Sequence, residues 1–152
     1  MKRLHIHISV DNLEKSCKFY TALFGMEPTK QKDDYIQWLV DEPAVNFAIS
    51  TGVDNKKGLN HLGLQVDSDE AVQELEERLQ KAGVSGEKQE EAVCCYAKSN
   101  KYWVQDPEGI VWENYHTMEQ MELFGGDSFT GGNGCCQPSF STNGKWSAGG
   151  TC

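Results

Sequence analysis

The sequence predicts an α+β fold in which two tandem βαβββ modules share one cupped mixed sheet. The main observation is an internal repeat: the stretch HIHISVDNLE, which begins at His5, returns at His61 as HLGLQVDSDE. In both copies a histidine is followed by alternating aliphatic residues, then by Val-Asp and a glutamate. Because the chain has only 152 residues, two such units indicate one domain built from paired modules.

Each copy is expected to begin as a strand and to continue as a helix. The aliphatic residues recur at every second position, so they form one face of a strand, and the histidine heads the opposite face. The acidic residues that follow have the spacing of helix-capping pairs: Asp11 with Glu14, and Asp67 with Glu70. Helical periodicity then leads to a glycine in each copy, Gly25 or Gly83, where the helix should end.

Short strand-like segments after each helix complete the two modules. They are residues 35–39 and 45–50 in the first module, and 92–97, 101–105 and 110–116 in the second. The turn from Asp106 to Gly109 joins the last two segments as a hairpin.

These elements place the first module at residues 1–56 and the second at residues 57–116. Residues 117–152 are rich in Gly, Ser, Thr and Asn and have little periodicity, which predicts a flexible C-terminal tail.

Composition excludes two classes of partner. The chain has 14 basic and 23 acidic residues and a net charge of -9, which repels nucleic acid and anionic membrane surfaces. No segment approaches the roughly 20 apolar residues of a membrane span, and the N-terminus has no small-residue cleavage site. We therefore expect a cytoplasmic protein that binds neither nucleic acid nor membrane. Pairing into a homodimer is left open.

The repeat also predicts a metal centre. His5 and His61 occupy equivalent places, so pseudo-twofold symmetry brings both imidazoles to the centre of the sheet, and Glu113 lies in the last strand. Two histidines and one carboxylate suit non-haem Fe(II) and oxygen chemistry, although Zn, Ni or Mn also accept this ligand set. The alternative to a metal centre is that both histidines are hydrogen-bonded strand residues and that the carboxylate is solvated.

His7 is a second candidate for the first ligand, because it faces the same side of the strand as His5. Its repeat partner Gly63, however, carries no ligand. We therefore assign His5 as ligand and give His7 a supporting role.

Adjacent cysteines supply the second chemical signal. Neighbouring strand residues point to opposite faces, so the Cys94-Cys95 pair can hold one atom only where the backbone leaves strand geometry. Two thiolates there would bind trivalent arsenic or cadmium; the alternative is one core and one incidental surface cysteine. The Cys135-Cys136 pair in the tail is a candidate for substrate capture. Tyr96 and Tyr115 are candidates to hydrogen-bond a substrate or a dioxygen adduct.

Two longer stretches carry a family resemblance. The run VDNLEKSCKFYTALFG follows the first histidine unit and VQDPEGIVWENY closes the second. Over roughly residues 1–116 the chain resembles the glyoxalase, bleomycin-resistance and extradiol dioxygenase superfamily, which has the vicinal oxygen chelate fold. The run AVCCYAKSNKYWVQDPEGIVWENYHT is similar to the arsenic and cadmium resistance branch. That resemblance implies His61 and Glu113 as metal ligands and Cys94 with Cys95 as the arsenic-binding pair.

Members of that branch include carbon-arsenic lyases, so the resemblance implies an Fe(II)-dependent, dioxygen-using enzyme of arsenic resistance. It would convert trivalent organoarsenicals, either methylarsenite or aromatic arsenicals, to arsenite. One alternative is an extradiol-type dioxygenase acting on a catechol, which needs the metal triad but no paired cysteines. Another is a non-catalytic protein that binds cadmium or arsenite. Glyoxalases use a fourth protein ligand in the last strand of the first module, and here that strand reads VNFAIS. It has no carboxylate, which argues against glyoxalase activity.

Overall fold

The computed structural model describes residues 2–51, 57–120, 139–140 and 146–147. Its main feature is one eight-stranded mixed sheet with the strand order β2-β3-β4-β1-β5-β8-β7-β6. The first module contains β1 (Arg3–Ser9), α1 (Leu13–Phe24), β2 (Lys30–Gln31), β3 (Tyr35–Val40) and β4 (Val45–Ser50). The second contains β5 (Gly58–Val66), α2 (Asp69–Lys81), β6 (Glu87–Cys94), β7 (Ala97–Gln105) and β8 (Val111–Gln120). The predicted fold of two βαβββ modules is confirmed. A separate pair, β9 (Ser139–Phe140) and β10 (Trp146–Ser147), is antiparallel.

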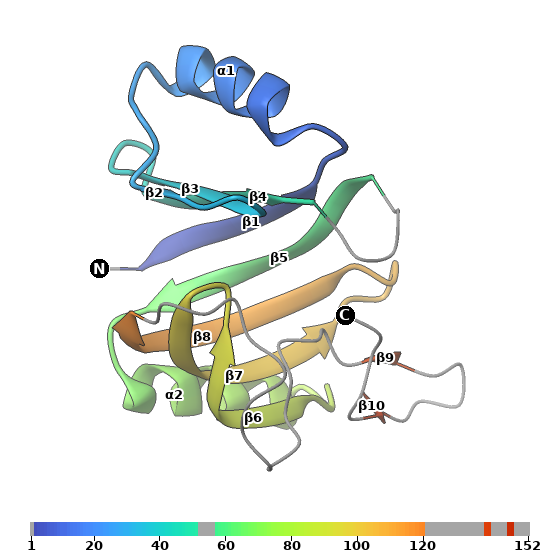
Figure 1. Cartoon of the computed structure of the whole chain (residues 1–152). Coiled ribbons are helices and arrows are strands. Elements are labelled where there is room, and N and C mark those ends of the chain that lie inside the picture. Colours follow the sequence, from blue (N-terminus) through green and yellow to red (C-terminus); the bar gives the residue numbers. More distant parts are fainter. Residues whose placement is uncertain (1, 52–56, 121–138, 141–145, 148–152) are drawn as a thin grey trace.

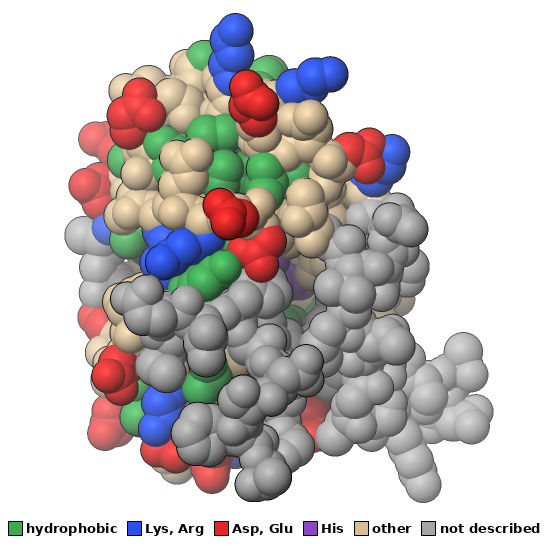
Figure 2. Space-filling model, viewed as in Figure 1, with side chains coloured by type: hydrophobic (Ala, Val, Ile, Leu, Met, Phe, Trp, Pro, Cys, Tyr) green, Lys and Arg blue, Asp and Glu red, His purple; other side chains and the backbone are tan. Residues whose placement is uncertain are grey.

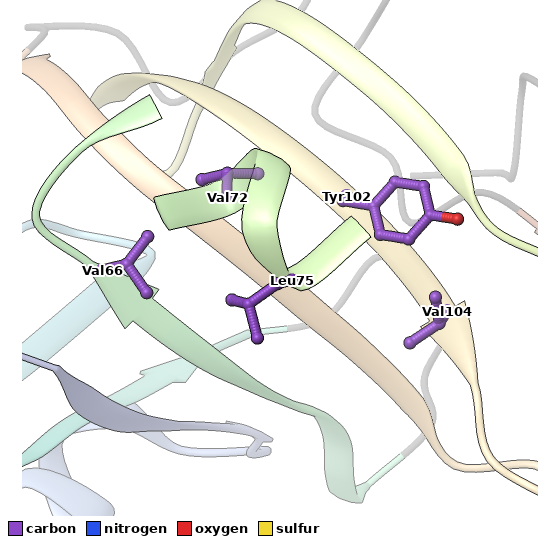
Figure 3. Close-up of a cluster of buried hydrophobic side chains, with 5 residues drawn as sticks. All are labelled: Val66, Val72, Leu75, Tyr102 and Val104. Atoms are coloured by element: carbon purple, nitrogen blue, oxygen red, sulfur yellow. The ribbon is translucent and has the colours of Figure 1, made fainter. Parts of the chain in front are cut away.

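The two helices lie on opposite outer sides of the molecule, with the strands between them (Figure 1). α1 covers an aromatic cluster of the first module that includes Trp38 and Phe47. α2 packs on the strands of the second module through a hydrophobic cluster formed by Val66, Val72, Leu75, Tyr102 and Val104 (Figure 3). Because each helix covers the outer face of its own strands, the inner face of the sheet remains for polar side chains.

The modules meet where β1 and β5 pair as antiparallel neighbours, with His7 opposite His61 and His5 opposite Gly63. Each of these strands also has a parallel neighbour, β4 for β1 and β8 for β5. This arrangement places the first strands of both modules side by side at the centre of the sheet, as the repeat predicts.

Both helix caps differ from the sequence prediction by one residue. Asn12 caps α1 by accepting a hydrogen bond from the Lys15 amide, and Ser68 caps α2 by accepting one from the Ala71 amide. The predicted starts at Asp11 and Asp67 are therefore wrong. A capping residue must place its side-chain oxygen over the amide of the third helical residue, and Asn12 and Ser68 stand at that distance.

Three strands of the second module also differ from the prediction. β6 and β7 begin earlier than expected, at Glu87 and Ala97. β6 ends at Cys94, so Cys95 and Tyr96 form a turn and not the end of a strand. β8 continues to Gln120 because its last residues pair with the start of β7, with Ala97 opposite Gln120. The part of the predicted flexible tail that follows β8 lies outside the described residues, apart from β9 and β10. Neither helix in the described part of the chain has the length and apolar character of a membrane span.

Candidate metal centre and thiol turn

Three potential metal ligands converge on the inner face of the sheet. His5 Nε2 lies 3.1 Å from His61 Nε2, and Glu113 Oε2 lies 3.6 Å from His5 Nε2 and 3.3 Å from His61 Nε2. All three side chains are buried. Divalent metals bind nitrogen and oxygen at about 2.0–2.2 Å, so neighbouring ligands around one metal lie about 3 Å apart. The spacing of these atoms therefore fits one metal ion.

Hydrogen bonds turn the lone pairs of both histidines toward this point. His5 Nδ1 lies 3.0 Å from the carbonyl oxygen of Asn46, which can only accept, so the Nδ1 proton faces Asn46. His61 Nδ1 lies 2.7 Å from Asn60 Oδ1, while the Asn60 amide nitrogen donates to Ser9 Oγ at 3.0 Å. Both Nε2 atoms are then acceptors that meet a carboxylate oxygen. A cation satisfies three converging acceptors.

The electrostatics favour the forms of these groups that bind metal. Burial and the neighbouring His61 lower the pKa of His5 to about 4, although Glu113 opposes this shift. Burial alone would raise the pKa of Glu113, but the positive charge of Lys101 holds it well below its usual value. At neutral pH the site therefore presents a neutral imidazole at His5 and an ionised carboxylate, as metal binding requires.

His7 lies beside these atoms. Its ligand atom and those of His5 and His61 all lie within 4.8 Å of one another. However, His7 Nε2 lies 2.8 Å from Ser50 Oγ, whereas His5 Nε2 faces His61 and Glu113. The arrangement supports His5 as the ligand on β1, and the supporting role of His7 stays a prediction.

A glycine explains why the second module has no counterpart of His7. Gly63 pairs with Glu113 across β5 and β8, and a Cβ atom on Gly63 would lie 1.9 Å from the Glu113 carbonyl oxygen. The corresponding pair in the first module is His7 with Ala48. Ala48 therefore stands at the symmetry-related place of Glu113, so this position in the first module carries no fourth ligand.

The cysteine pair occupies a tight turn between β6 and β7. Cys94 pairs with Ala97, and the two residues between them, Cys95 and Tyr96, have φ angles of 53° and 61°. Left-handed conformations at both central residues are typical of a type I′ hairpin turn. This geometry brings the sulfur atoms of Cys94 and Cys95 to 3.2 Å from each other. In the structure Cys94 is disulfide-bonded and Cys95 is a free thiol.

The thiol turn, residues 94–97, contacts the first module next to the metal centre. Tyr96 packs with Tyr35 and Ala48, and Cys95 packs against the same cluster. The Tyr96 hydroxyl donates to Asp34 Oδ1 at 2.6 Å. Burial raises the pKa of Cys95 to about 12, and the charges of Lys101 and Glu113 also act on this thiol. The Cys95 thiol is therefore close enough to Lys101 and Glu113 to feel their charges.

Two residues beside the candidate ligands, Lys101 and Asn46, are not among the site residues that the sequence predicts. Lys101 is buried and its Nζ lies 2.6 Å from Glu113 Oε1. Asn46 donates to the Tyr115 hydroxyl at 2.7 Å, and the Tyr115 ring lies 5.3 Å from the His5 ring. The alternation of strand residues could have found Lys101, because it shares a face with buried Trp103 two positions later. Cys135 and Cys136 lie outside the described residues.

Only a small area of histidine is visible on the face drawn in Figure 2. This view agrees with the burial of His5, His7 and His61, each of which is 6% exposed or less.

A paired-module protein with a candidate metal site on its cupped sheet is the class that these features define. A sequence model of the Glyoxalase/Bleomycin resistance protein/Dioxygenase superfamily matches residues 2–114. The chain belongs to this superfamily.

Three proteins with curated names are similar to this chain over most of its length. A "Probable trivalent organoarsenical cleaving enzyme" of Bacillus subtilis (strain 168) is 38% identical over 138 residues, which are 90% of this chain and 91% of that protein. A trivalent organoarsenical cleaving enzyme of Bacillus sp. (strain MD1) is 40% identical over 80% of this chain and 77% of its own. The cadmium-induced protein CadI of Mycobacterium tuberculosis is 35% identical over 82% of each chain.

Solved structures agree on the fold. A variant of homoprotocatechuate 2,3-dioxygenase from Brevibacterium fuscum has a TM-score of 0.58 at 19% identity, over 80% of this chain and 34% of that one. The Mn(II)-bound glyoxalase from Novosphingobium aromaticivorans has a TM-score of 0.57 at 16% identity, over 81% of this chain and 43% of its own.

Proposed function

We propose that the protein is an Fe(II)-dependent, dioxygen-using enzyme that cleaves the carbon-arsenic bond of trivalent organoarsenicals and releases arsenite. The observation that carries this proposal is the position of the thiol turn. It packs against Ala48, where a carboxylate would otherwise supply a fourth protein ligand. The cysteines of this turn would then be able to reach the side of the metal centre that has no fourth protein ligand.

The two ligand sets suit two different partners. Thiolates are soft ligands and prefer trivalent arsenic, whereas His5, His61 and Glu113 offer the nitrogen and oxygen donors that suit Fe(II). When bound, iron would supply electrons and a site for dioxygen, which oxidises the organic group. Cys94 and Cys95 would hold arsenic so that the carbon-arsenic bond faces the metal, and much of the rate would then come from proximity.

The relatives support the choice of substrate, because two of them are named for cleavage of trivalent organoarsenicals. Arsenic can bind both sulfurs only when Cys94 is a thiol, and Cys94 is disulfide-bonded in the structure. Reduction must therefore come before substrate binding. A cytoplasmic location would maintain the reduced state.

The test is turnover under controlled oxygen. The reduced protein is loaded with Fe(II) without air, methylarsenite is added with or without air, and arsenic species are separated by chromatography. We expect arsenite only when both Fe(II) and air are present. Cys94→Ser and Cys95→Ser should each abolish turnover with nearly unchanged iron content, while Cys17→Ser, which removes a free cysteine of α1, should keep it.

A double Cys94→Ser, Cys95→Ser variant that cleaves methylarsenite at the parent rate would refute this function. A catechol dioxygenase would then be the better hypothesis, because it uses the same metal triad without paired thiols.

A second candidate is a protein that binds cadmium or arsenite through its thiols without chemistry. The paired cysteines would suit this role too, and one relative is named as a cadmium-induced protein. Such a protein would bind one equivalent of Cd(II) or arsenite and release no new arsenic species. Repeated turnover of methylarsenite excludes this candidate.

A further inference from the structure

Lys101 is a buried lysine next to the candidate metal centre. Its side chain is 5% exposed, and its Nζ lies 2.6 Å from Glu113 Oε1. Lysine is almost never buried without a partner. We propose that Lys101 is a positioning residue that restricts Glu113 to one-oxygen coordination of the metal. This inference rests on the proposed metal centre and deepens it.

The two oxygens of Glu113 have separate partners. Oε1 accepts from Lys101, while Oε2 lies 3.3 Å from His61 Nε2 and 3.6 Å from His5 Nε2. If both oxygens bound the metal, the Lys101 ammonium and the metal ion would compete for Oε1, and each positive charge would weaken the contact of the other. One-oxygen coordination is therefore the stable arrangement. In this arrangement Glu113 takes up only one coordination position of the metal. A further position then stays available to substrate and dioxygen.

The charge of Lys101 also opposes metal binding, because the ammonium and the metal ion share one carboxylate. Lys101→Met keeps the length of the side chain and removes the charge. Glu113 could then use both oxygens, and the metal-free protein would lose the counter-ion of Glu113. Both effects favour metal binding.

Lys101→Arg should have the opposite effect. It keeps the charge, but the planar guanidinium can donate to both oxygens of one carboxylate. That pairing would draw Oε2 away from His5 and His61. The two substitutions at one position therefore predict metal affinities that change in opposite directions.

The experiment is titration with Co(II), followed by visible absorption and equilibrium dialysis, for the parent, Lys101→Met and Lys101→Arg. We expect Lys101→Met to bind Co(II) about tenfold more tightly and Lys101→Arg about tenfold more weakly. The Lys101→Met spectrum should change with the added oxygen ligand, and its methylarsenite turnover should fall. Lys98→Met is the matched control: Lys98 lies on the same strand and pairs with Glu91 at 3.0 Å, so its loss should alter neither affinity nor spectrum.

Weaker Co(II) binding by Lys101→Met, or a spectrum equal to that of the parent, would overturn the inference. If Lys101→Met does not fold without metal, Lys101→Arg still tests the inference, because unchanged affinity in that variant contradicts it. A parent protein that binds no Co(II), or that binds it equally after His61→Ala, would refute the metal centre itself. Normal parent binding with unchanged Lys101 variants refutes only the role of Lys101.

Discussion

In the first module, β1 carries His5 and His7 on the inner face of the sheet, and β4 places Ala48 opposite His7. In the second module, β5 carries His61 and Gly63, and β8 places Glu113 opposite Gly63. The histidines at the head of each repeat are equivalent, whereas the next position and its partner on the parallel strand differ. The second module thus offers two of the three candidate ligands, because Gly63 admits the Glu113 backbone at close range.

The first module uses the corresponding place differently. Ala48 is fully buried and packs with Tyr35 and Tyr96, so it supports the turn that carries the cysteine pair. The comparison teaches that the repeat positions the centre, while the chemistry depends on the positions where the two copies differ. Each prediction below changes one of these positions or the groups beside them.

The largest effect should follow from removing the carboxylate of the second module. Glu113→Gln keeps the size of the side chain and can still accept a hydrogen bond from Lys101. We expect metal affinity to fall more than about 100-fold, beyond the usual effect of losing a supporting partner. Metal content after dialysis measures this change. Glu119→Gln, near the exposed end of β8, is the control, and equal metal content in both variants would contradict the ligand assignment.

The buried histidine of the first module should make stability dependent on pH. Burial lowers the pKa of His5 in the folded protein to about 4, below the usual histidine value of 6.5. Between these pH values the unfolded chain binds a proton at His5 and the folded chain does not. The free energy of unfolding of the metal-free protein should therefore decrease by roughly 3 kcal/mol as the pH falls from 6.5 to 4.

Urea denaturation at a series of pH values measures this slope, and His5→Gln should make it shallower. Glu113 adds a further loss at lower pH, because its pKa in the folded state is also lowered. An unchanged slope in His5→Gln would show that His5 is not the buried neutral group.

Making the modules more alike should remove activity. Ala48→Glu places a carboxylate at the symmetry-related position of Glu113, where it would occupy the open side of the metal and displace the thiol turn. We expect methylarsenite turnover to fall about 100-fold while the protein still binds metal. Ala48→Gln has nearly the same volume without the charge. If it binds metal no more weakly than Ala48→Glu, the added carboxylate is not a ligand.

Giving the second module a side chain at Gly63 should separate β5 from β8. The Cβ of Gly63→Ala would meet the Glu113 carbonyl oxygen at 1.9 Å, so the strands must move. We expect a loss of about 2 kcal/mol in the free energy of unfolding and weaker metal binding. Gly25→Ala, where a Cβ meets nothing within 4 Å but φ is +65°, separates the close contact from the effect of backbone conformation. Metal binding should weaken only in Gly63→Ala.

The smallest effect is expected at His7, which occupies in the first module the repeat position that Gly63 occupies in the second. His7→Ala removes the hydrogen bond with Ser50 and should lower the free energy of unfolding by about 1 kcal/mol. Metal should remain bound. Complete loss of metal from His7→Ala, with metal retained by His5→Ala, would reverse the assignment of the β1 ligand.

Much of this protein follows from local sequence pattern. The repeated histidine unit and strand alternation predict the two modules, the face that carries His5 and His61, and the paired cysteines at a break in strand geometry. Glu113 is also predictable, because it lies in the final strand of the second repeat. Alternation specifies the side on which a residue lies, but it says nothing about which strand residue stands opposite it.

That pairing is a property of the tertiary structure. The register of β7 with β8 pairs Lys101 with Tyr115, so the Lys101 ammonium reaches Glu113 two residues earlier on β8. The parallel register of β1 with β4 places Ala48 opposite His7. The hydrogen bonds to Asn46 and Asn60 that orient the two histidine rings likewise join residues whose roles no local pattern specifies. The physical reason is that strand register is set by the packing of the whole sheet, turns and helices included, whereas the period of a strand is already present in a few consecutive residues.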